Sequence, residues 1–450
     1  MEYSELIESK KHSTIDYGIK PLWLPDKMFD FQKYITELMI KKGRYAGFLD
    51  TGTGKTLIEL TIGNNYVKHT NKPVPIITPL AVADQHLREA EKFGIPDVEH
   101  TKNGKYTKKI ILINYERLHY LNPSDFDCVI LDESSILKNF DGKIREQITS
   151  FLKKVKYRYL FTATPSPNDF VELGTSSEAL GYLGYTDMLG RFFTNNEDTI
   201  KPQNIGTKWI LKGHAEDDFF KCISMRKPSD LGFSDEKHIL PQLITNYNEV
   251  INTKPLTING QMQLYANVAK GFKEIRAEEK ATIKLRCEKA YELTQGHNIS
   301  VYWCNRNDEG DLLQDIDKNA YQIKGNMNLE KKEELLLAFI DGEINRLITK
   351  PKMTAFGLNW QHCNHTVYFP TFSYEQYYQA IRRFWRYGQT KPVIVDIINT
   401  DGQKRIIDSI NAKMIKANKL FDKLNSTLNS EFKIKTKEFN KKVIKPSFLN

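Results

Sequence analysis

The sequence contains few cysteines and no long apolar segment. Its five cysteines are scattered and none forms a Cys-x-x-Cys pair, which argues against structural zinc and against a disulfide framework. No apolar run approaches the roughly 20 residues that a membrane-spanning helix needs, and the first residues do not resemble a secretion signal. We therefore expect a soluble enzyme of the reducing cytoplasm, with no membrane partner.

The positive charge of the chain is concentrated at its C-terminal end. The formal net charge is +9, and residues 403–450 carry twelve Lys and Arg against four Asp and Glu. Such a tail favours a polyanionic partner such as nucleic acid, because each neutralised phosphate releases counterions. A charged helix that is merely solvated explains the same composition equally well.

Short apolar runs alternate with turns and helical stretches in two parts of the chain. Runs of this length are typical of strands buried on both faces, and the alternation with helices predicts parallel sheets. The pattern breaks between about residues 170 and 255, where aromatic residues, Gly and Pro interrupt it. The predicted strands are 46–49, 74–77, 110–113, 128–131 and 159–161, then 299–303, 347–349, 366–369 and 393–397, and the predicted helices of the second part are 281–293, 329–340 and 374–386.

The length of 450 residues fits two or three domains. We predict two tandem α/β lobes of parallel sheet flanked by helices, with a helical insertion between them and a basic tail. The expected boundaries are an N-terminal extension at 1–27, a first lobe at 28–170, an insertion and linker at 171–255, a second lobe at 256–402 and a basic extension at 403–450.

A glycine-rich segment follows the first predicted strand and precedes a helical stretch. Phosphate binding needs glycines that turn backbone N–H groups inward, a lysine for the β and γ oxygens, and a hydroxyl for Mg²⁺. The strict pattern begins with glycine where this chain has Leu49, and a structural turn is the alternative interpretation. The residues expected to bind ATP are Thr51, Gly52, Thr53, Gly54, Lys55 and Thr56.

Two acidic residues, Asp132 and Glu133, end a later predicted strand. Adjacent carboxylates at this position can divide the work of phosphoryl transfer, one holding Mg²⁺ and the other polarising the attacking water. We expect Asp132 and Thr56 to hold Mg²⁺, and Glu133 to act as the general base. A strand-terminal Asp-Glu pair alone is more often a solvated turn, so its weight comes from the glycine-rich segment upstream.

The segment Asp132-Glu133-Ser134-Ser135, with Lys138-Asn139 after it, resembles the Asp-Glu-x-His box of superfamily 2 helicases, especially their Snf-type subgroup. Ser135 stands where that family usually has His. Residues 212–216 and 227–233 are similar to compact phage and prophage helicases, and the resemblance covers roughly residues 28–400. It implies two RecA-like lobes that bind ATP and Mg²⁺ between them.

The resemblance also assigns roles to single residues. Gln32, in the segment Phe29-Asp30-Phe31-Gln32, would recognise adenine, and Gly357 would contact the nucleotide from the second lobe. The residues that it places on nucleic acid are Pro79, Asn114, Tyr115, Thr162, Thr164, Lys350, Lys352 and Asn359.

The segment 379–389 contains two arginines, Arg383 and Arg386, three positions apart. On a helix they would share one face, so that both guanidinium groups could reach one polyphosphate. Arginines that only stack or form surface ion pairs are the alternative. The segment resembles motif VI of the family, which implies that Arg386 is the finger at the γ-phosphate and Arg383 its partner, beside the catalytic Lys55, Asp132 and Glu133.

These features predict an ATP-dependent DNA helicase or translocase that remodels branched or forked DNA in replication, recombination or repair. In a phage-like setting it would work in the host cytoplasm, with other replication or recombination proteins as partners. An RNA helicase is one alternative, although the endings Lys138-Asn139 and Gly388-Gln389 resemble the DNA-directed subgroup. A nucleotide-gated DNA clamp with little turnover is the other, and Leu49 and Ser135 are the departures that favour it.

Overall fold

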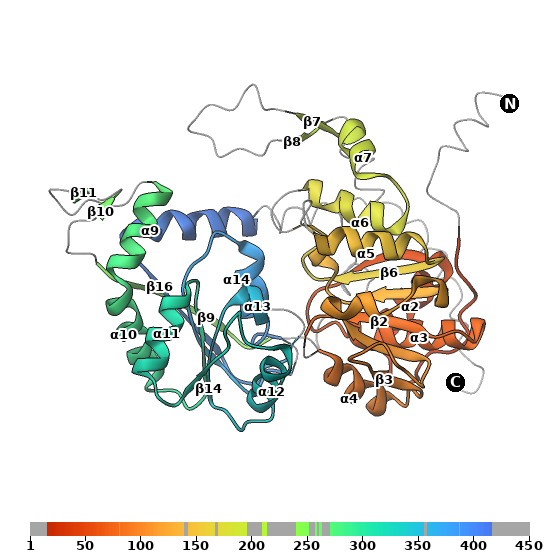
Figure 1. Ribbon diagram of the computed structural model, residues 1–450, viewed down its shortest axis with the longest axis horizontal. Helices are drawn as coiled ribbons and strands as arrows, with labels where there is room; N and C mark the ends of the chain where they lie inside the picture. The colour runs from red at the N-terminus through yellow and green to blue at the C-terminus, as the bar shows by residue number, and fades with distance from the viewer. Residues whose placement is uncertain are drawn as a thin grey trace, which may run out of the picture.

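The computed structural model describes residues 16–80, 82–138, 143–166, 170–195, 209–213, 240–251, 257–258, 261–262, 271–354, 358–386 and 388–415. These residues form two lobes that lie side by side (Figure 1). Each lobe contains a sheet of six strands, and every strand pair in both sheets is parallel. The predicted fold class, two tandem α/β lobes, is therefore confirmed.

The first lobe has the strand order β1-β6-β5-β2-β4-β3. Alternate strand residues face opposite sides: Ile76 packs on the side of α2, α3 and α4, whereas Ile77 packs on the side of α5 and α6. Its elements are β1 (Arg44–Phe48), β2 (Val74–Thr78), β3 (Val98–His100), β4 (Ile110–Asn114), β5 (Cys128–Leu131), β6 (Tyr157–Thr162), α2 (Asp30–Lys42), α3 (Lys55–Thr70), α4 (Ala83–Phe93), α5 (Lys143–Lys153) and α6 (Leu173–Leu180).

The second lobe has the strand order β13-β14-β12-β15-β16-β9. Residues Val301 and Trp303 face α12 and α14, and the intervening Tyr302 faces α10 and α11. Its elements are β9 (Leu243–Glu249), β12 (Ser300–Trp303), β13 (Ala320–Gln322), β14 (Arg346–Thr349), β15 (His365–Tyr368), β16 (Val393–Asn399), α9 (Phe272–Ala281), α10 (Ile283–Thr294), α11 (Asn307–Ile316), α12 (Leu329–Ile340), α13 (Pro351–Thr354) and α14 (Tyr374–Ile381).

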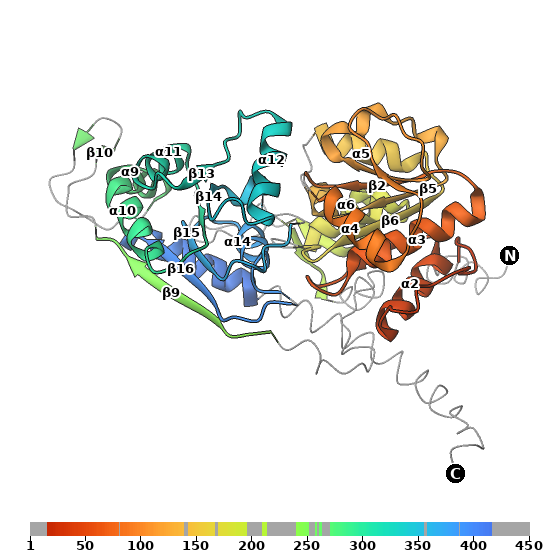
Figure 2. The same ribbon diagram turned by 90° about the horizontal axis from the view of Figure 1, so that it is seen from below.

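The range expected to be insertion and linker contributes to both lobes. Helix α6 places Ala179 and Leu180 in the core of the first lobe. Strand β9 is the edge strand of the second sheet, paired with β16 along its whole length (Figure 2). The remaining described elements of this range are α7 (Tyr185–Phe192) and the antiparallel pair β7 (Phe193–Asn195) and β8 (Trp209–Leu211), and a second antiparallel pair, β10 (Thr257–Ile258) and β11 (Gln261–Met262), follows β9.

The start of the C-terminal extension is part of the second lobe. Residues 404–415 are helical, and Ile406 and Ile410 pack with Ile275 and Tyr374. Residues 416–450, which hold most of the basic residues of the tail, lie outside the described part of the chain.

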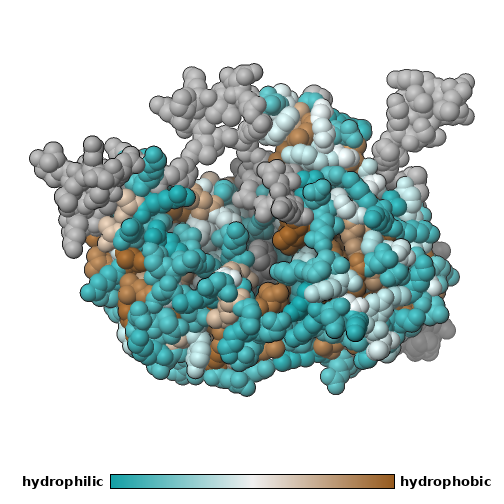
Figure 3. Space-filling model, in the orientation of Figure 1, coloured by the Kyte–Doolittle hydropathy of each residue, from teal (hydrophilic) through white to brown (hydrophobic). Residues whose placement is uncertain are grey.

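Hydrophilic residues dominate the face in Figure 3, and hydrophobic residues form small separate areas on it. No helix among the described residues is both long and apolar enough to cross a membrane.

Candidate active site

The loop after β1 has the backbone that a phosphate-binding loop requires. Gly52 and Gly54 have φ values of 83° and 84°, in the left-handed region that favours glycine. A Cβ on Gly54 would lie 2.2 Å from Nε2 of Gln32, so a larger residue is excluded there on two grounds. The next residue, Lys55, begins helix α3. The loop therefore directs the N-terminus of a 16-residue helix toward its own concave side, where an anion is favoured.

The side chain of Lys55 lies inside this loop. Its Nζ donates to the carbonyl oxygens of Leu49, at 3.0 Å, and Asp50, at 3.2 Å. Burial lowers the pKa of the Lys55 ammonium, and the carboxylates of Glu133 and Asp132 oppose that shift. Leu49 stands where the strict pattern has glycine. Its side chain is buried at 2 % exposure, and its backbone oxygen accepts the hydrogen bond from Lys55.

Gln32 connects helix α2 to the same loop. Its Nε2 donates to the carbonyl of Thr53 at 2.9 Å, and its Oε1 accepts from the backbone N–H of Phe29 at 3.0 Å. The residue expected to recognise adenine thus lies against the loop and helps to fix its shape.

The acidic pair is buried at the end of β5. Asp132 and Glu133 are 6 % and 5 % exposed, and Glu133 has a φ of 54°, which is uncommon for a residue other than glycine. Burial, and then the nearby Glu59, raises the pKa of Asp132 to about 7. Burial also raises the pKa of Glu133, against the opposing charge of Lys55. Buried carboxylates with raised pKa values beside a charged partner are candidates for a functional site.

Glu133 is hydrogen-bonded to the segment that contains Thr162 and Thr164. Its Oε1 accepts from the hydroxyl of Thr162 and, at 3.1 Å, from Ser135, which replaces the histidine usual in the family. The hydroxyl of Thr162 in turn accepts from the backbone N–H of Thr164 at 3.0 Å. Both threonines are at most 5 % exposed. Their side chains therefore link the acidic pair to its surroundings and are not available to a nucleic acid in this conformation.

The link continues into the second lobe. The hydroxyl of Thr164 accepts from Nε2 of Gln379 at 3.1 Å and donates to Oε1 of Glu375 at 3.4 Å. Glu375 also forms an ion pair with Lys138 of the first lobe. Helix α14 is thus hydrogen-bonded directly to the residues around Glu133.

Arg383 and Arg386 do not lie on a regular helix, and this part of the sequence-based prediction is wrong. Helix α14 ends at Ile381, where the backbone bonds change to i→i+3 spacing, from Arg383 N–H to Ala380 at 3.3 Å and from Phe384 N–H to Ile381 at 3.1 Å. The carbonyl of Arg383 then accepts from the backbone N–H of Trp360 at 3.0 Å. Both guanidinium groups nevertheless donate to the carbonyl of Leu358, at 2.5 Å and 3.3 Å. The two guanidinium groups are therefore brought together by this turn, and not by a shared face of a helix.

The two arginines face the acidic pair of the first lobe. Burial, and then Arg386, lowers the pKa of Arg383 to about 9, and Glu133 and Asp132 act in the opposite direction. Arg383 thus remains protonated at neutral pH. The Nε atom of Arg386 is buried without a hydrogen-bond partner among the described residues. A buried donor of this kind requires an acceptor, and a phosphate oxygen would supply one.

Sequence reasoning missed Arg382, which joins the second lobe to the phosphate loop of the first. Its Nη2 lies 3.0 Å from Oδ1 of Asp50 and 3.1 Å from the carbonyl of Thr51, and its Nε donates to the Thr51 hydroxyl. Tyr378, one turn earlier, donates to Oδ1 of Asp50 at 2.6 Å. The available signal was a third arginine beside the predicted pair, four residues after a tyrosine. Its partners are more than 300 positions away in the sequence, so the residues around Arg382 do not predict this contact.

Three residues expected on nucleic acid belong to the first lobe's interior or its loops. Asn114 is fully buried, with Nδ2 donating to the carbonyl of Pro79 at 3.1 Å and Oδ1 accepting from Arg117 at 3.0 Å. Tyr115 is 5 % exposed and donates to the carbonyl of Asp132. These side chains connect the loops at the sheet edge to the acidic pair. Asn114 and Tyr115 are therefore too buried to contact nucleic acid directly in this conformation.

The carboxyl edge of the second sheet encloses a cavity of about 310 Å³. Three basic side chains line it, each following a different strand: Arg306 after β12, Lys324 after β13 and Lys350 after β14. Arg306 and Lys324 are paired with Asp308 and Asp311. Lys350 forms no ion pair within the described part of the chain.

The other predicted residues of this lobe are placed as follows. Lys352 is exposed on the short helix α13, and Asn359 is partly buried with Oδ1 accepting from the N–H of Gln361 at 3.3 Å. Gly357, expected to contact the nucleotide, lies outside the described residues.

The donors present at the site fit a magnesium ion. Thr56, at the N-terminus of α3, offers a hydroxyl, and Asp132 offers a carboxylate. Mg²⁺ prefers oxygen ligands and keeps several waters beside one or two carboxylates.

Two family models match the sequence. Residues 29–173 match the DEAD/DEAH box helicase family, and residues 282–388 match the helicase conserved C-terminal domain. Comparison with curated proteins gives no match.

Two solved structures are similar to the chain. The SWI2/SNF2 ATPase core from Sulfolobus solfataricus, in complex with dsDNA, is 18 % identical, and the match covers 95 % of this chain and 99 % of that chain with a TM-score of 0.41. A Dbp5 variant from S. cerevisiae, bound to RNA and ADP BeF3, is 13 % identical, and the match covers 87 % and 93 % with a TM-score of 0.53. The second likeness shows the same fold. With one helicase domain model on each lobe, the chain is an ATP-hydrolysing enzyme of the helicase type.

Proposed function

We propose that the chain is a DNA-stimulated ATPase that translocates on DNA and remodels branched or forked structures. The observation that carries the proposal is the junction between the lobes. Motif VI of the second lobe is hydrogen-bonded to the phosphate loop through Arg382 and to the surroundings of Glu133 through Gln379 and Thr164. A change in the nucleotide would therefore change the contacts that hold the lobes together.

The residues of the site divide the hydrolysis of ATP between the lobes. The β and γ phosphates would replace the loop carbonyls as partners of Lys55, and the N–H groups of the loop would bind the same oxygens. Glu133 would orient the attacking water and accept its proton. Arg383 and Arg386 would stabilise the negative charge that develops on the transferred phosphoryl group.

Magnesium would be held by Thr56 and Asp132. It would neutralise phosphate charge during transfer and order the β and γ oxygens.

DNA is proposed as the polymer because of the residues that resemble the Snf-type subgroup, Lys138 and Gly388-Gln389. The cavity of the second lobe supports a phosphate-backbone contact, since three strand ends bring Arg306, Lys324 and Lys350 to it. A setting in phage-like replication or recombination follows from the similarity of residues 212–216 and 227–233, which lie almost wholly outside the described residues.

The test is ATP turnover by the wild type, Lys55→Ala and a control, Lys68→Ala. Lys68 lies on the same helix but is exposed at its far end. Each protein is assayed alone and with single-stranded DNA, duplex DNA, a branched junction and RNA. We expect DNA, and the junction most, to stimulate the wild type and Lys68→Ala, and Lys55→Ala to lose turnover by about 10²-fold or more.

Two other outcomes would replace the proposal. Stimulation by RNA alone would make the chain an RNA helicase. Turnover that stays low with every polymer, together with nucleotide-dependent DNA binding, would make it a clamp that uses ATP as a switch.

A further inference from the structure

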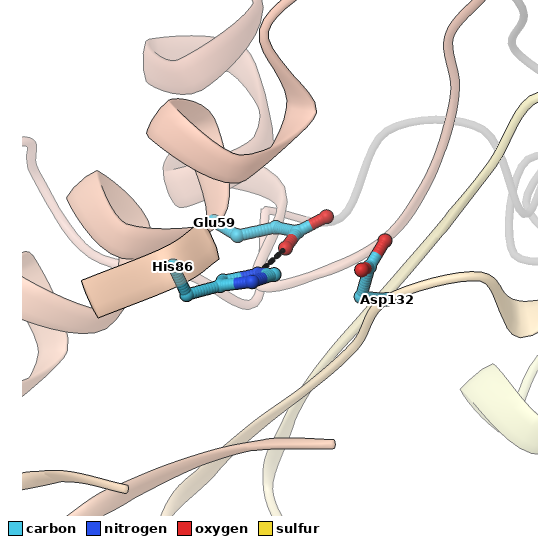
Figure 4. Close-up of side chains that lie close together, drawn as sticks. All are labelled: Glu59, His86 and Asp132. Carbon is cyan, nitrogen blue, oxygen red and sulfur yellow. Dashed lines mark hydrogen bonds and ion pairs between the residues drawn. The ribbon is translucent and has the colours of Figure 1, made fainter. Parts of the chain in front are cut away.

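A second group of buried side chains lies behind the phosphate loop. Glu59 on α3, His86 on α4 and Asp132 after β5 each offer one ligand atom, and these atoms lie within 4.8 Å of one another (Figure 4). Glu59 and His86 are completely buried. Within the described ranges, no other set of three His, Cys, Asp or Glu side chains is gathered in this way.

The orientation of His86 is that of a metal ligand. Its Nδ1 lies 3.2 Å from the carbonyl oxygen of Val82, the residue before α4. A neutral ring that donates from Nδ1 carries its lone pair on Nε2, the atom that lies 2.9 Å from Oε2 of Glu59. Metal-binding histidines are commonly fixed in this way, with the second ring nitrogen donating to a carbonyl. Nε2 of His86 and Oε2 of Glu59 can share either a proton, which would make the ring a cation, or a metal ion.

Glu59 has a further unsatisfied atom. Its Oε1 is buried without a hydrogen-bond partner among the described residues. Figure 4 shows the carboxylates of Glu59 and Asp132 directed toward each other. The ammonium of Lys55 does not fill this role, because its Nζ donates to the carbonyls of Leu49 and Asp50. Buried carboxylate oxygens are strongly unfavourable unless a donor or a metal ion binds them.

We propose that Glu59, His86 and Asp132 bind a divalent transition-metal ion such as Mn²⁺ or Zn²⁺, with water in the remaining positions. Bonds of about 2.0–2.2 Å separate adjacent ligand atoms by about 3 Å, which is the separation already present between His86 and Glu59. Two carboxylates and a neutral imidazole match the charge of a divalent ion. The imidazole favours Mn²⁺ or Zn²⁺ over Mg²⁺, which prefers oxygen ligands.

This site is different from the one proposed for magnesium and nucleotide. Glu59 and His86 take no part in the proposed hydrolysis, and the ion is bound without ATP. Because Asp132 belongs to both groups, the ion would also fix that carboxylate on the side of α3 and α4.

The direct test is a titration of nucleotide-free protein with Mn²⁺, followed by electron paramagnetic resonance. We expect the wild type to bind one Mn²⁺ per chain, and His86→Gln and Glu59→Gln to bind it at least about tenfold more weakly. The matched control is His365→Gln in the second lobe. His365 also lies 2.9 Å from a buried carboxylate, that of Asp396, but the other oxygen of Asp396 accepts from Asn246 and Asn248. This variant should bind Mn²⁺ like the wild type.

A second measurement needs no substitution at the site. Electron spin echo modulation of the wild type should show one imidazole nitrogen coupled to the bound Mn²⁺, and it decides the question if the variants fail to fold by circular dichroism. Absence of the nitrogen coupling, or Mn²⁺ binding that both variants leave unchanged, would overturn the proposal. Neither result bears on ATP hydrolysis, because no nucleotide is present.

Discussion

The two lobes share one architecture, but the acidic pair of the first lobe and Asp396 of the second lobe are held in opposite ways. In the first lobe, burial and then Glu59 raise the pKa of Asp132 to about 7, and burial raises the pKa of Glu133. In the second lobe, burial would raise the pKa of Asp396, but hydrogen bonds from His365, Asn246 and Asn248 outweigh it and the pKa lies below its ordinary value. The first lobe therefore holds negative charge that needs a ligand, whereas the second holds a carboxylate that its own donors satisfy.

The acidic pair of the first lobe thus serves the chemistry of the site, whereas Asp396 of the second lobe serves the stability of the fold. Parallel sheets bring loops to the carboxyl edge in both lobes, and the residues on those loops decide what each edge does. Asp132, Glu133 and Lys55 lie at the carboxyl edge of the first sheet, and basic residues line the cavity at the carboxyl edge of the second sheet. Substitutions can test the contrast by removing one group at a time.

The largest effect is expected for Arg386→Ala, which removes one of the two arginines that face the acidic pair. Turnover should fall by about 10³-fold or more, because an arginine at the γ-phosphate is worth roughly 10³–10⁵ in rate. The measurement is polymer-stimulated ATP hydrolysis. Arg276→Ala, an exposed arginine on α9, removes the same charge from the same lobe and should leave turnover unchanged. Equal losses in both variants would mean that the effect is general electrostatics.

Glu133→Gln should lower turnover by about 10²–10⁴-fold, since the amide cannot accept the proton of the attacking water. Its free energy of unfolding should stay the same or rise, because a carboxylate with a raised pKa is costly to bury in its charged form. Turnover and urea unfolding are measured on the same preparation. A loss of stability comparable to the loss of rate would place Glu133 among the structural residues, and the contrast with Asp396 would disappear.

The parts of the site that could be predicted from the sequence are those formed by contiguous residues. The phosphate loop is readable because Gly52, Gly54 and Lys55 follow one another between a strand and a helix. Strands β12, β14, β15 and β16 of the second lobe were predicted from their apolar runs, whereas the short strand β13 was not. Strand β9 was not predicted, because its residues are only partly buried or exposed and do not form an apolar run.

Contacts between distant segments could not be predicted. Glu59 and His86 are 27 positions apart on two helices, and neither belongs to a motif. Helix α14 was predicted to continue to Arg386, but it ends at Ile381, and the carbonyl of Arg383 accepts from Trp360. The helical spacing of the sequence does not predict such tertiary hydrogen bonds. The roles assigned to Gln32, Lys352 and Asn359 stay predictions.

Asp396→Asn should have the reverse effect of Glu133→Gln. The amide keeps one oxygen and replaces the other by a donor, so it cannot accept from His365, Asn246 and Asn248 together, and the free energy of unfolding should fall by about 1–3 kcal/mol while turnover per folded molecule is retained. Because the folded pKa is depressed, the carboxylate's contribution is present above the unfolded value, near pH 4, and is lost as pH falls through the lower folded value. Urea unfolding from pH 7 down to about pH 2 should show a constant difference between the proteins above about pH 4 that shrinks below it. Asp315→Asn, in an exposed ion pair, is the control and should show almost no difference at any pH.

The smallest effect is expected for Lys350→Ala at the cavity of the second lobe. Lys350 is the cavity's one basic side chain without a carboxylate partner among the described residues, so it is the group best able to neutralise a phosphate. DNA affinity should fall several-fold for every sequence, and the slope of log affinity against log salt should decrease by about 1. Lys318→Ala, whose exposed side chain pairs with Asp315 away from the cavity, should leave the slope unchanged. If both variants change it equally, the contact is diffuse attraction; if only Lys350→Ala does, the second lobe's edge binds the backbone while the first lobe's edge binds the nucleotide.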